Sequence, residues 1–139
     1  MFSIEKTVTF HAAHRLPQME EGHQCRNLHG HTYKVTMKLS SAAVGGDGIM
    51  VDFGELSKVV KQYDHTFLGS GTVVVDGVEV KSMLGDLPAT AEMLAAAIGH
   101  QLVAMLDAGN ADLPEEMYTR LDEVEVWETE TSVVRFTPR

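Results

Sequence analysis

Two long segments near the N-terminus alternate between polar and apolar side chains, which indicates a fold built on paired strands. In residues 29–39, His29, His31 and every second residue after them form one face, and small or charged residues form the other. Residues 4–14 alternate in the same way and end at His14, with a break at Lys6. Because successive side chains of a strand point to opposite faces, both segments predict half-buried strands. Residues 15–28, with their turn-forming residues, predict a long loop between them.

The rest of the chain predicts two helices, a hairpin and a final strand pair. Asp52 is a helix N-cap with Glu55 in capping-box spacing, and Thr90 is the N-cap of a second helix that follows Pro88. Between the helices, Asp76-Gly77 separates β-branched residues and predicts a hairpin over 72–80. Residues 124–137 predict two more strands. The order favours one α+β domain over 1–139, with an antiparallel sheet and two helices on one face.

Composition restricts the class of protein. The formal net charge is −9, which argues against nucleic-acid binding, since that requires a basic surface. The longest apolar run, over 93–106, is shorter than the roughly 18 residues that cross a bilayer. No signal peptide is evident, and a single cysteine cannot form an internal disulfide. We therefore expect a cytoplasmic protein that interacts with neither nucleic acid nor membranes.

The histidines indicate a metal site. His29 and His31 stand two residues apart on a predicted strand, so both side chains lie on the same face. His14 lies on the apolar face of the preceding strand, and three imidazoles suit Zn²⁺. The alternative is three half-buried histidines that each find a hydrogen-bond partner. His11 resembles a ligand because it precedes His14 by three residues, but this spacing turns it to the opposite face, as a surface or interface residue.

Each of the other candidate residues is compatible with two interpretations of its role. Cys25 is either a fourth metal ligand or a nucleophile or base, since a nearby cation stabilises the thiolate. Asp64 beside His65 is either an oriented proton shuttle or an ordinary pair at a helix end. Glu128 shares a strand face with valines, where a carboxylate is costly unless paired. It predicts either a ligand that donates hydrogen bonds or a salt bridge.

Together, the motifs resemble the family of 6-pyruvoyl-tetrahydropterin and 6-carboxytetrahydropterin synthases over nearly the whole chain. The motifs are FHAAHRLP at 10–17, CRNLHGHTYKV at 25–35, VDFGEL at 51–56, DHTFL at 64–68, PATAE at 88–92 and VWET at 126–129. The resemblance implies the tunnelling fold (T-fold), in which subunits join their sheets into a β-barrel. It also implies a homohexamer, a dimer of trimers, with active sites at the subunit interfaces.

The resemblance also implies roles for individual residues. His14, His29 and His31 match zinc ligands, and Cys25, Asp64 and His65 match a catalytic triad. Glu128 matches the carboxylate that anchors the pterin ring, and Thr90 and Glu92 match a substrate-binding block. Charge supplies a further expectation: in an acidic protein, a triphosphate needs local cations, and Arg15 and Arg26 adjoin the ligand segments.

The implied reaction converts 7,8-dihydroneopterin triphosphate to 6-carboxy-5,6,7,8-tetrahydropterin, with release of acetaldehyde and triphosphate. It belongs to 7-deazaguanine (queuosine) biosynthesis. The short spacing between Cys25 and His29 resembles the carboxy-forming members. The first alternative is the pyruvoyl-forming synthase, which eliminates triphosphate without cleaving the side chain. The second is a non-catalytic, zinc-stabilised interaction protein. Residues 72–86 form a longer segment than the family usually has, near the candidate triad in sequence.

Overall fold

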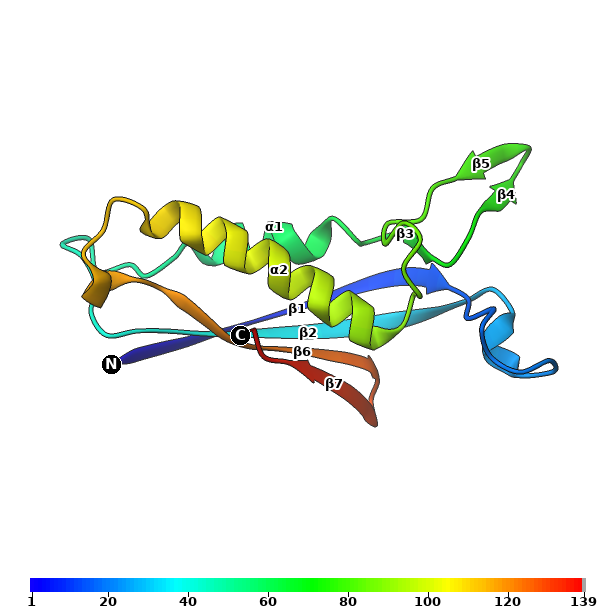
Figure 1. The fold of residues 1–139 in the computed structure, drawn as a ribbon, viewed down its shortest axis with the longest axis horizontal. Helices are drawn as coiled ribbons and strands as arrows, with labels where there is room; N and C mark the ends of the chain where they lie inside the picture. The colour runs from blue at the N-terminus through cyan, green and yellow to red at the C-terminus, as the bar shows by residue number, and fades with distance from the viewer. Residues whose placement is uncertain (139) are drawn as a thin grey trace.

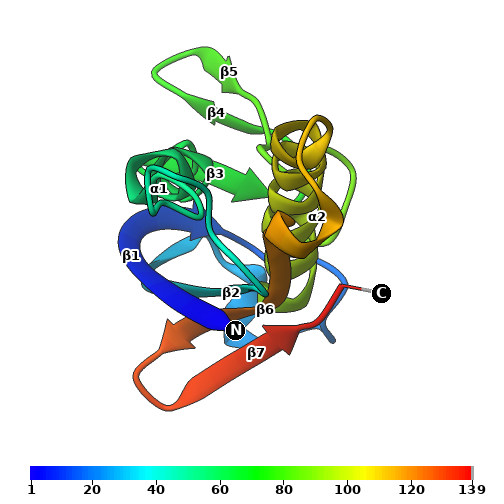
Figure 2. The same ribbon diagram turned by 90° about the vertical axis from the view of Figure 1, so that its left-hand side faces the viewer.

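A five-stranded sheet forms the centre of the protein in the computed structural model, which describes residues 1–138. The order of its strands is β3-β1-β2-β6-β7. The model confirms the predicted α+β class and the two helices on one face (Figures 1 and 2). The strands of the sheet are β1 (Phe2–His14), β2 (His29–Ser41), β3 (Thr66–Gly69), β6 (Arg120–Thr129) and β7 (Ser132–Phe136).

β1 and β2 pair antiparallel along their whole length, from Phe2 opposite Ser41 to His14 opposite His29. This register has no shift, and it aligns the two alternating patterns so that their apolar faces coincide. Phe10 and Tyr33 are paired residues on that face, and their rings stack with centroids 5.0 Å apart. The three histidines of the predicted metal site therefore meet at one end of the strand pair.

Helices α1 (Phe53–Lys61) and α2 (Ala91–Asn110) cover the apolar face of the sheet, and the other face is open (Figure 2). Both predicted N-caps are present: Asp52 accepts a hydrogen bond from the Gly54 N–H, and Thr90 accepts one from the Met93 N–H. The carboxylate of Glu55 pairs with Lys58 rather than completing a capping box. The core between the layers includes Val35, Met37, Leu56, Val60, Leu94, Ile98, Leu102, Val124 and Val126.

Strand β3 was not expected from the sequence, and it adds one parallel pair to a sheet that is otherwise antiparallel. β3 runs parallel to β1, with Ala12 opposite Thr66. Four residues are too few to show a period of two, so no pattern distinguished this strand from a loop. Its position at the sheet edge places Asp64 and His65, which immediately precede it, beside β1.

The hairpin predicted over 72–80 is confirmed as β4 (Val73–Val75) and β5 (Val78–Val80). Asp76 and Gly77 both have positive φ, as a tight two-residue hairpin turn requires. The hairpin extends past the end of the sheet that bears the histidines, as does the loop over 15–28 (Figure 1). Two short 3₁₀ helices, η1 (Gln24–Arg26) and η2 (Glu115–Met117), complete the described chain, in which no helix is long and apolar enough to span a membrane.

Candidate metal centre and active site

His14, His29 and His31 converge at the end of β1 and β2. One ring nitrogen from each lies within 4.8 Å of those of the other two, so the three residues could hold a metal ion. The rings stand edge to face, with centroids 4.5, 5.0 and 4.9 Å apart. Two N–Zn bonds of about 2.0–2.1 Å at a tetrahedral angle separate their nitrogens by about 3.4 Å, which is compatible with this cluster.

Backbone carbonyls fix the orientation of two of these rings. The Nδ1–H of His14 donates to the Ala89 carbonyl at 2.6 Å, and the Nδ1–H of His29 donates to the Asn27 carbonyl at 2.7 Å. A carbonyl only accepts, so in each neutral ring the Nε2 carries a lone pair. These two Nε2 atoms are 2.9 Å apart. Two lone pairs can face one another at this distance if one nitrogen carries a proton that hydrogen-bonds to the other, or if both nitrogens bind the same metal ion.

Burial favours the neutral, metal-binding form of two of the imidazoles, those of His14 and His31. Burial is the largest cause that lowers the pKa of His14 below its ordinary value, and the same holds for His31. The Nε2 of His31 is buried and has no hydrogen-bond partner among residues 1–138. Carbonyl contacts of the kind made by His14 and His29 commonly orient ligand histidines. The chemistry of this donor set therefore fits a metal ion.

Glu128 lies beside the cluster, with its Oε1 3.6 Å from the Nε2 of His31. Its side chain is 29% exposed, so it is turned inward as predicted and still reaches solvent. The separation is too long for a hydrogen bond, so Glu128 keeps acceptor capacity for a ligand.

Tyr33 is a buried neighbour of the cluster. Its hydroxyl is 3.5 Å from the Nδ1 of His14, and burial raises the pKa of this hydroxyl.

Cys25 lies in η1, in the loop between the metal-site strands. Its backbone carbonyl accepts a hydrogen bond from the Leu16 N–H at 2.7 Å, which ties the loop to the end of β1. Its thiol is half-buried and, among residues 1–138, is not part of the group that could hold a metal. This geometry favours a three-histidine centre with an open coordination position.

Asp64 and His65 form a pair on the opposite side of the sheet from His14. The Oδ2 of Asp64 is 3.0 Å from the Nδ1 of His65. The ring of His65 stands edge-on to His11, which faces away from the helices as predicted. Within residues 1–138, the structure gives this pair no contact with the histidine cluster or with Cys25. One chain therefore contains all the expected residues but does not assemble them into one pocket.

The other predicted residues have structural contacts. Arg15 donates to the carbonyls of Ser70 and Thr72, and Arg26 donates to the carbonyl of Met19. Both arginines brace loops, and each keeps further N–H groups for a ligand. Thr90 caps α2, next to the Ala89 carbonyl that holds His14. Glu92 is exposed in the first turn of α2.

Comparison with known proteins gives the evolutionary context. A family model described as 6-pyruvoyl tetrahydropterin synthase matches residues 3–139. The 6-carboxy-5,6,7,8-tetrahydropterin synthase of Synechocystis sp. is 33% identical over 149 residues, covering 100% of this chain and 96% of that protein. The one from Bacillus subtilis is 37% identical over 68 residues, 48% of this chain and 46% of that protein. The match to the Haemophilus influenzae relative covers 52% of that protein. The chain thus spans about half the length of the B. subtilis and H. influenzae relatives.

Solved structures share the fold. An uncharacterized protein from Wolinella succinogenes superposes with a TM-score of 0.71 at 19% identity, covering 99% of this chain and 98% of the other. The 6-pyruvoyl tetrahydropterin synthase of Plasmodium vivax gives a TM-score of 0.66 at 22% identity, covering 98% of both chains. With the family model matched over nearly the whole sequence, this chain belongs to the 6-pyruvoyl tetrahydropterin synthase family.

Proposed function

We propose that this protein is a zinc-dependent lyase that converts 7,8-dihydroneopterin triphosphate to 6-carboxy-5,6,7,8-tetrahydropterin. The reaction consumes water and releases acetaldehyde and triphosphate, in the pathway to 7-deazaguanines such as queuosine. The observation that carries this proposal is the histidine cluster, in which two carbonyl-oriented rings direct their lone pairs at one another 2.9 Å apart. Glu128 beside that cluster supplies an acceptor for a ligand.

The proposed roles follow from the chemistry of each side chain. His14, His29 and His31 hold the ion, which when bound acts as a Lewis acid toward the hydroxyls of the substrate side chain. Glu128 accepts paired hydrogen bonds from the pterin amino group and the adjacent ring N–H, since an ionised carboxylate is an acceptor only. Cys25 moves a proton at its thiol, and His65 moves one at its imidazole while Asp64 orients the ring.

Assembly of several subunits would bring together the site residues that lie apart in one chain. Because Asp64 and His65 lie on the opposite side of the sheet from His14, we propose that the site is completed at the interfaces of a homohexamer, a dimer of trimers. The open face of the sheet and its two edge strands, β3 and β7, are the surfaces available for closing a barrel. The lone cysteine suits a reducing compartment such as the cytoplasm.

The second candidate is the pyruvoyl-forming reaction, favoured by the description of the family model and by the name of the P. vivax protein. The carboxy-forming reaction is favoured by the names of the curated relatives, including the full-length Synechocystis match, and by the short spacing between Cys25 and His29. A non-catalytic zinc protein is the least supported, because Cys25 lies outside the metal group and Glu128 has no structural need to face it.

Acetaldehyde distinguishes the two reactions. The zinc-loaded protein is incubated with 7,8-dihydroneopterin triphosphate, and triphosphate, acetaldehyde and the pterin mass are measured. We expect acetaldehyde in the same molar amount as triphosphate, because cleavage of the side chain must release it. Triphosphate without acetaldehyde would assign the pyruvoyl-forming reaction, and neither product would reject both.

A further inference from the structure

His65 depends on its neighbours for its orientation. Its side chain is 78% exposed, so core packing does not hold it, and its backbone has a φ of 58°. A positive φ is uncommon outside glycine and persists where surrounding contacts enforce it. An exposed imidazole must lie in one rotamer to move a proton efficiently, because small displacements of a reacting group are costly. The contacts that enforce this geometry therefore matter for function.

One residue makes backbone contacts to both members of the Asp64–His65 pair. The N–H of His11 donates to the Oδ1 of Asp64 at 2.9 Å, and its carbonyl accepts from the N–H of His65 at 2.6 Å. The other carboxylate oxygen of Asp64 contacts the ring of His65. The hydrogen bond from His11 is also the largest cause that lowers the pKa of Asp64, which favours the charged carboxylate.

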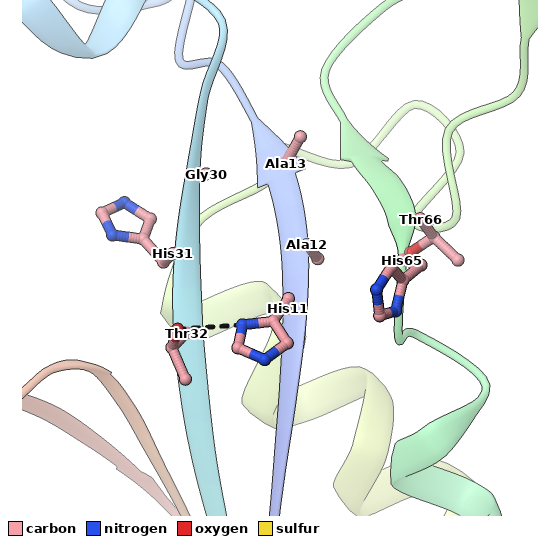
Figure 3. A pocket seen from close by; sticks show the side chains of 8 residues that line it. All are labelled: His11, Ala12, Ala13, Gly30, His31, Thr32, His65 and Thr66. Atoms are coloured by element: carbon pink, nitrogen blue, oxygen red, sulfur yellow. Dashed lines mark hydrogen bonds between the residues drawn. The ribbon is translucent and has the colours of Figure 1, made fainter.

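The side chain of His11 adds a contact of its own. Its Nδ1 is 2.9 Å from the hydroxyl of Thr32, the residue opposite it on β2, and this hydrogen bond holds the ring upright on the open face of the sheet. In that position the ring stands edge-on to His65, with centroids 6.0 Å apart and an interplanar angle of 73°. Figure 3 shows Thr32 on β2, His11 on β1 and His65 just before β3 side by side, with the ring of His31 extending from β2 away from β1.

These rings border a cleft of about 520 Å³. Its floor is formed by small residues, Ala13 and Gly30, which lie opposite one another on β1 and β2. A Cβ at Gly30 would lie 3.4 Å from the Ala12 carbonyl, within ordinary contact, so the glycine is useful here for the room it leaves. His11 and His65 thus both line one cleft, with their rings edge to face.

From these contacts we infer that His11 is a positioning residue: its peptide holds Asp64 and His65, and its Thr32-anchored ring fixes the rotamer of His65 at the edge of the cleft. This inference rests on the proposed role of the Asp64–His65 pair in proton transfer. It gives His11, which the sequence alone placed on the surface, a part in the same site. The peptide contacts do not involve the side chain of His11, so substitutions other than proline isolate the contribution of the ring.

The test combines a structural and a kinetic measurement on His11→Ala, His11→Phe and Thr32→Val. Thr9→Ala is the matched control, since Thr9 is exposed on the same face of β1, two residues earlier. Three-bond couplings report the χ1 rotamer of His65, and kcat, KM and bound zinc are measured on the same samples. In His11→Ala we expect rotamer averaging at His65 and a kcat about 10-fold lower, with KM and zinc unchanged.

His11→Phe and Thr32→Val both keep an aromatic ring at position 11 but lose its hydrogen bond to residue 32, so each should give a smaller loss of kcat than His11→Ala. A single His65 rotamer in His11→Ala, as in Thr9→Ala, would overturn the inference, and so would an unchanged kcat. If the wild-type protein turns over no pterin, the proposed function fails, and the couplings alone then decide whether His11 positions His65.

Discussion

Cys25 can be tested separately from the metal site because its thiol is not one of the three grouped ligands. Cys25→Ala should keep stoichiometric zinc, since all three histidines remain and the Cys25 carbonyl still accepts from Leu16. Turnover should fall by about 10²-fold or more, the usual contribution of a proton-transfer group. Metal analysis and steady-state kinetics measure both. A folded variant that purifies without zinc would show that the thiol is a ligand.

Glu128 should bind the pterin and not the metal. Removing its charge while keeping its shape, in Glu128→Gln, replaces one acceptor oxygen by a donor and should weaken binding of a pterin by about 10–100-fold, the value of a charged hydrogen bond. Zinc content should not change. Glu130→Gln, in the exposed turn after β6, is the control. Calorimetry with zinc-loaded protein measures both affinities, and equal affinity in Glu128→Gln and wild type would remove the anchor role.

At the residue level, the histidine cluster was predictable and its supports were not. Once the alternating pattern predicts a strand, the two-residue spacing of His29 and His31 places both on one face. The carbonyls of Ala89 and Asn27, which orient the rings, belong to every peptide bond and leave no signal in the side-chain pattern. His11 was correctly placed on the open face, but its link to Asp64 depends on a parallel strand that was not predicted.

Among the elements, predictability followed length and local chemistry. β1 and β2 are long enough for their period to appear, the caps at Asp52 and Thr90 act through contacts within one helical turn, and the Asp76-Gly77 turn is local. β3 is a short edge strand whose partner lies more than fifty residues away in the chain. Pairings of that kind arise from tertiary packing, which no local pattern encodes.

Helix α2 packs closely on β7 at Gly99. A Cβ at that position would lie 2.5 Å from the ring of Phe136, closer than real Cβ contacts come. Gly99→Ala should therefore lower the free energy of unfolding by about 1–3 kcal/mol, the usual cost of overpacking. Gly109→Ala is the matched control in the same helix, because nothing lies within 4 Å of its Cβ. It should be neutral or stabilising, by up to about 1 kcal/mol. Denaturant unfolding compares the two, and equal effects would mean that Phe136 moves aside freely.

On the scale of the whole molecule, the two faces of the sheet carry different features. The helix-covered face holds the core and, at one end, the histidine cluster, while the open face bears polar residues and the cleft beside His65. The β4–β5 hairpin and the loop containing Cys25 both extend from the histidine end (Figure 1). Arg15 connects these features, since it follows His14 and donates to carbonyls at the root of the hairpin. These hydrogen bonds tie the root of the hairpin to the residue that follows the metal-site histidine His14.

The open face is stabilised by a network of charges centred on Glu125, although the whole protein is acidic. The Nζ of Lys38 is 3.1 Å from the Oε1 of Glu125, and the Nη2 of Arg135 is 2.8 Å from its Oε2. The side chain of Glu125 is only 11% exposed. Burial acts to raise the pKa of Glu125, but the hydrogen bonds and charges of Lys38 and Arg135 outweigh it and leave the pKa below the ordinary 4.5. The folded protein thus binds a proton at Glu125 less readily than the unfolded chain does.

This difference sets the direction of the pH dependence. A carboxyl group whose pKa is lowered by folding contributes its full stabilisation above the unfolded pKa of 4.5 and loses it as the pH falls toward the folded pKa. Glu125→Gln should therefore be less stable than wild type at pH 7, and the gap should narrow below pH 4.5 because only wild type has this stabilisation to lose. Thermal unfolding from pH 3 to 7 measures the difference in stability between wild type and Glu125→Gln. Glu130→Gln, at an exposed position, is the control. A gap that stays constant across this range would show that Glu125 stabilises the sheet by packing and not by charge.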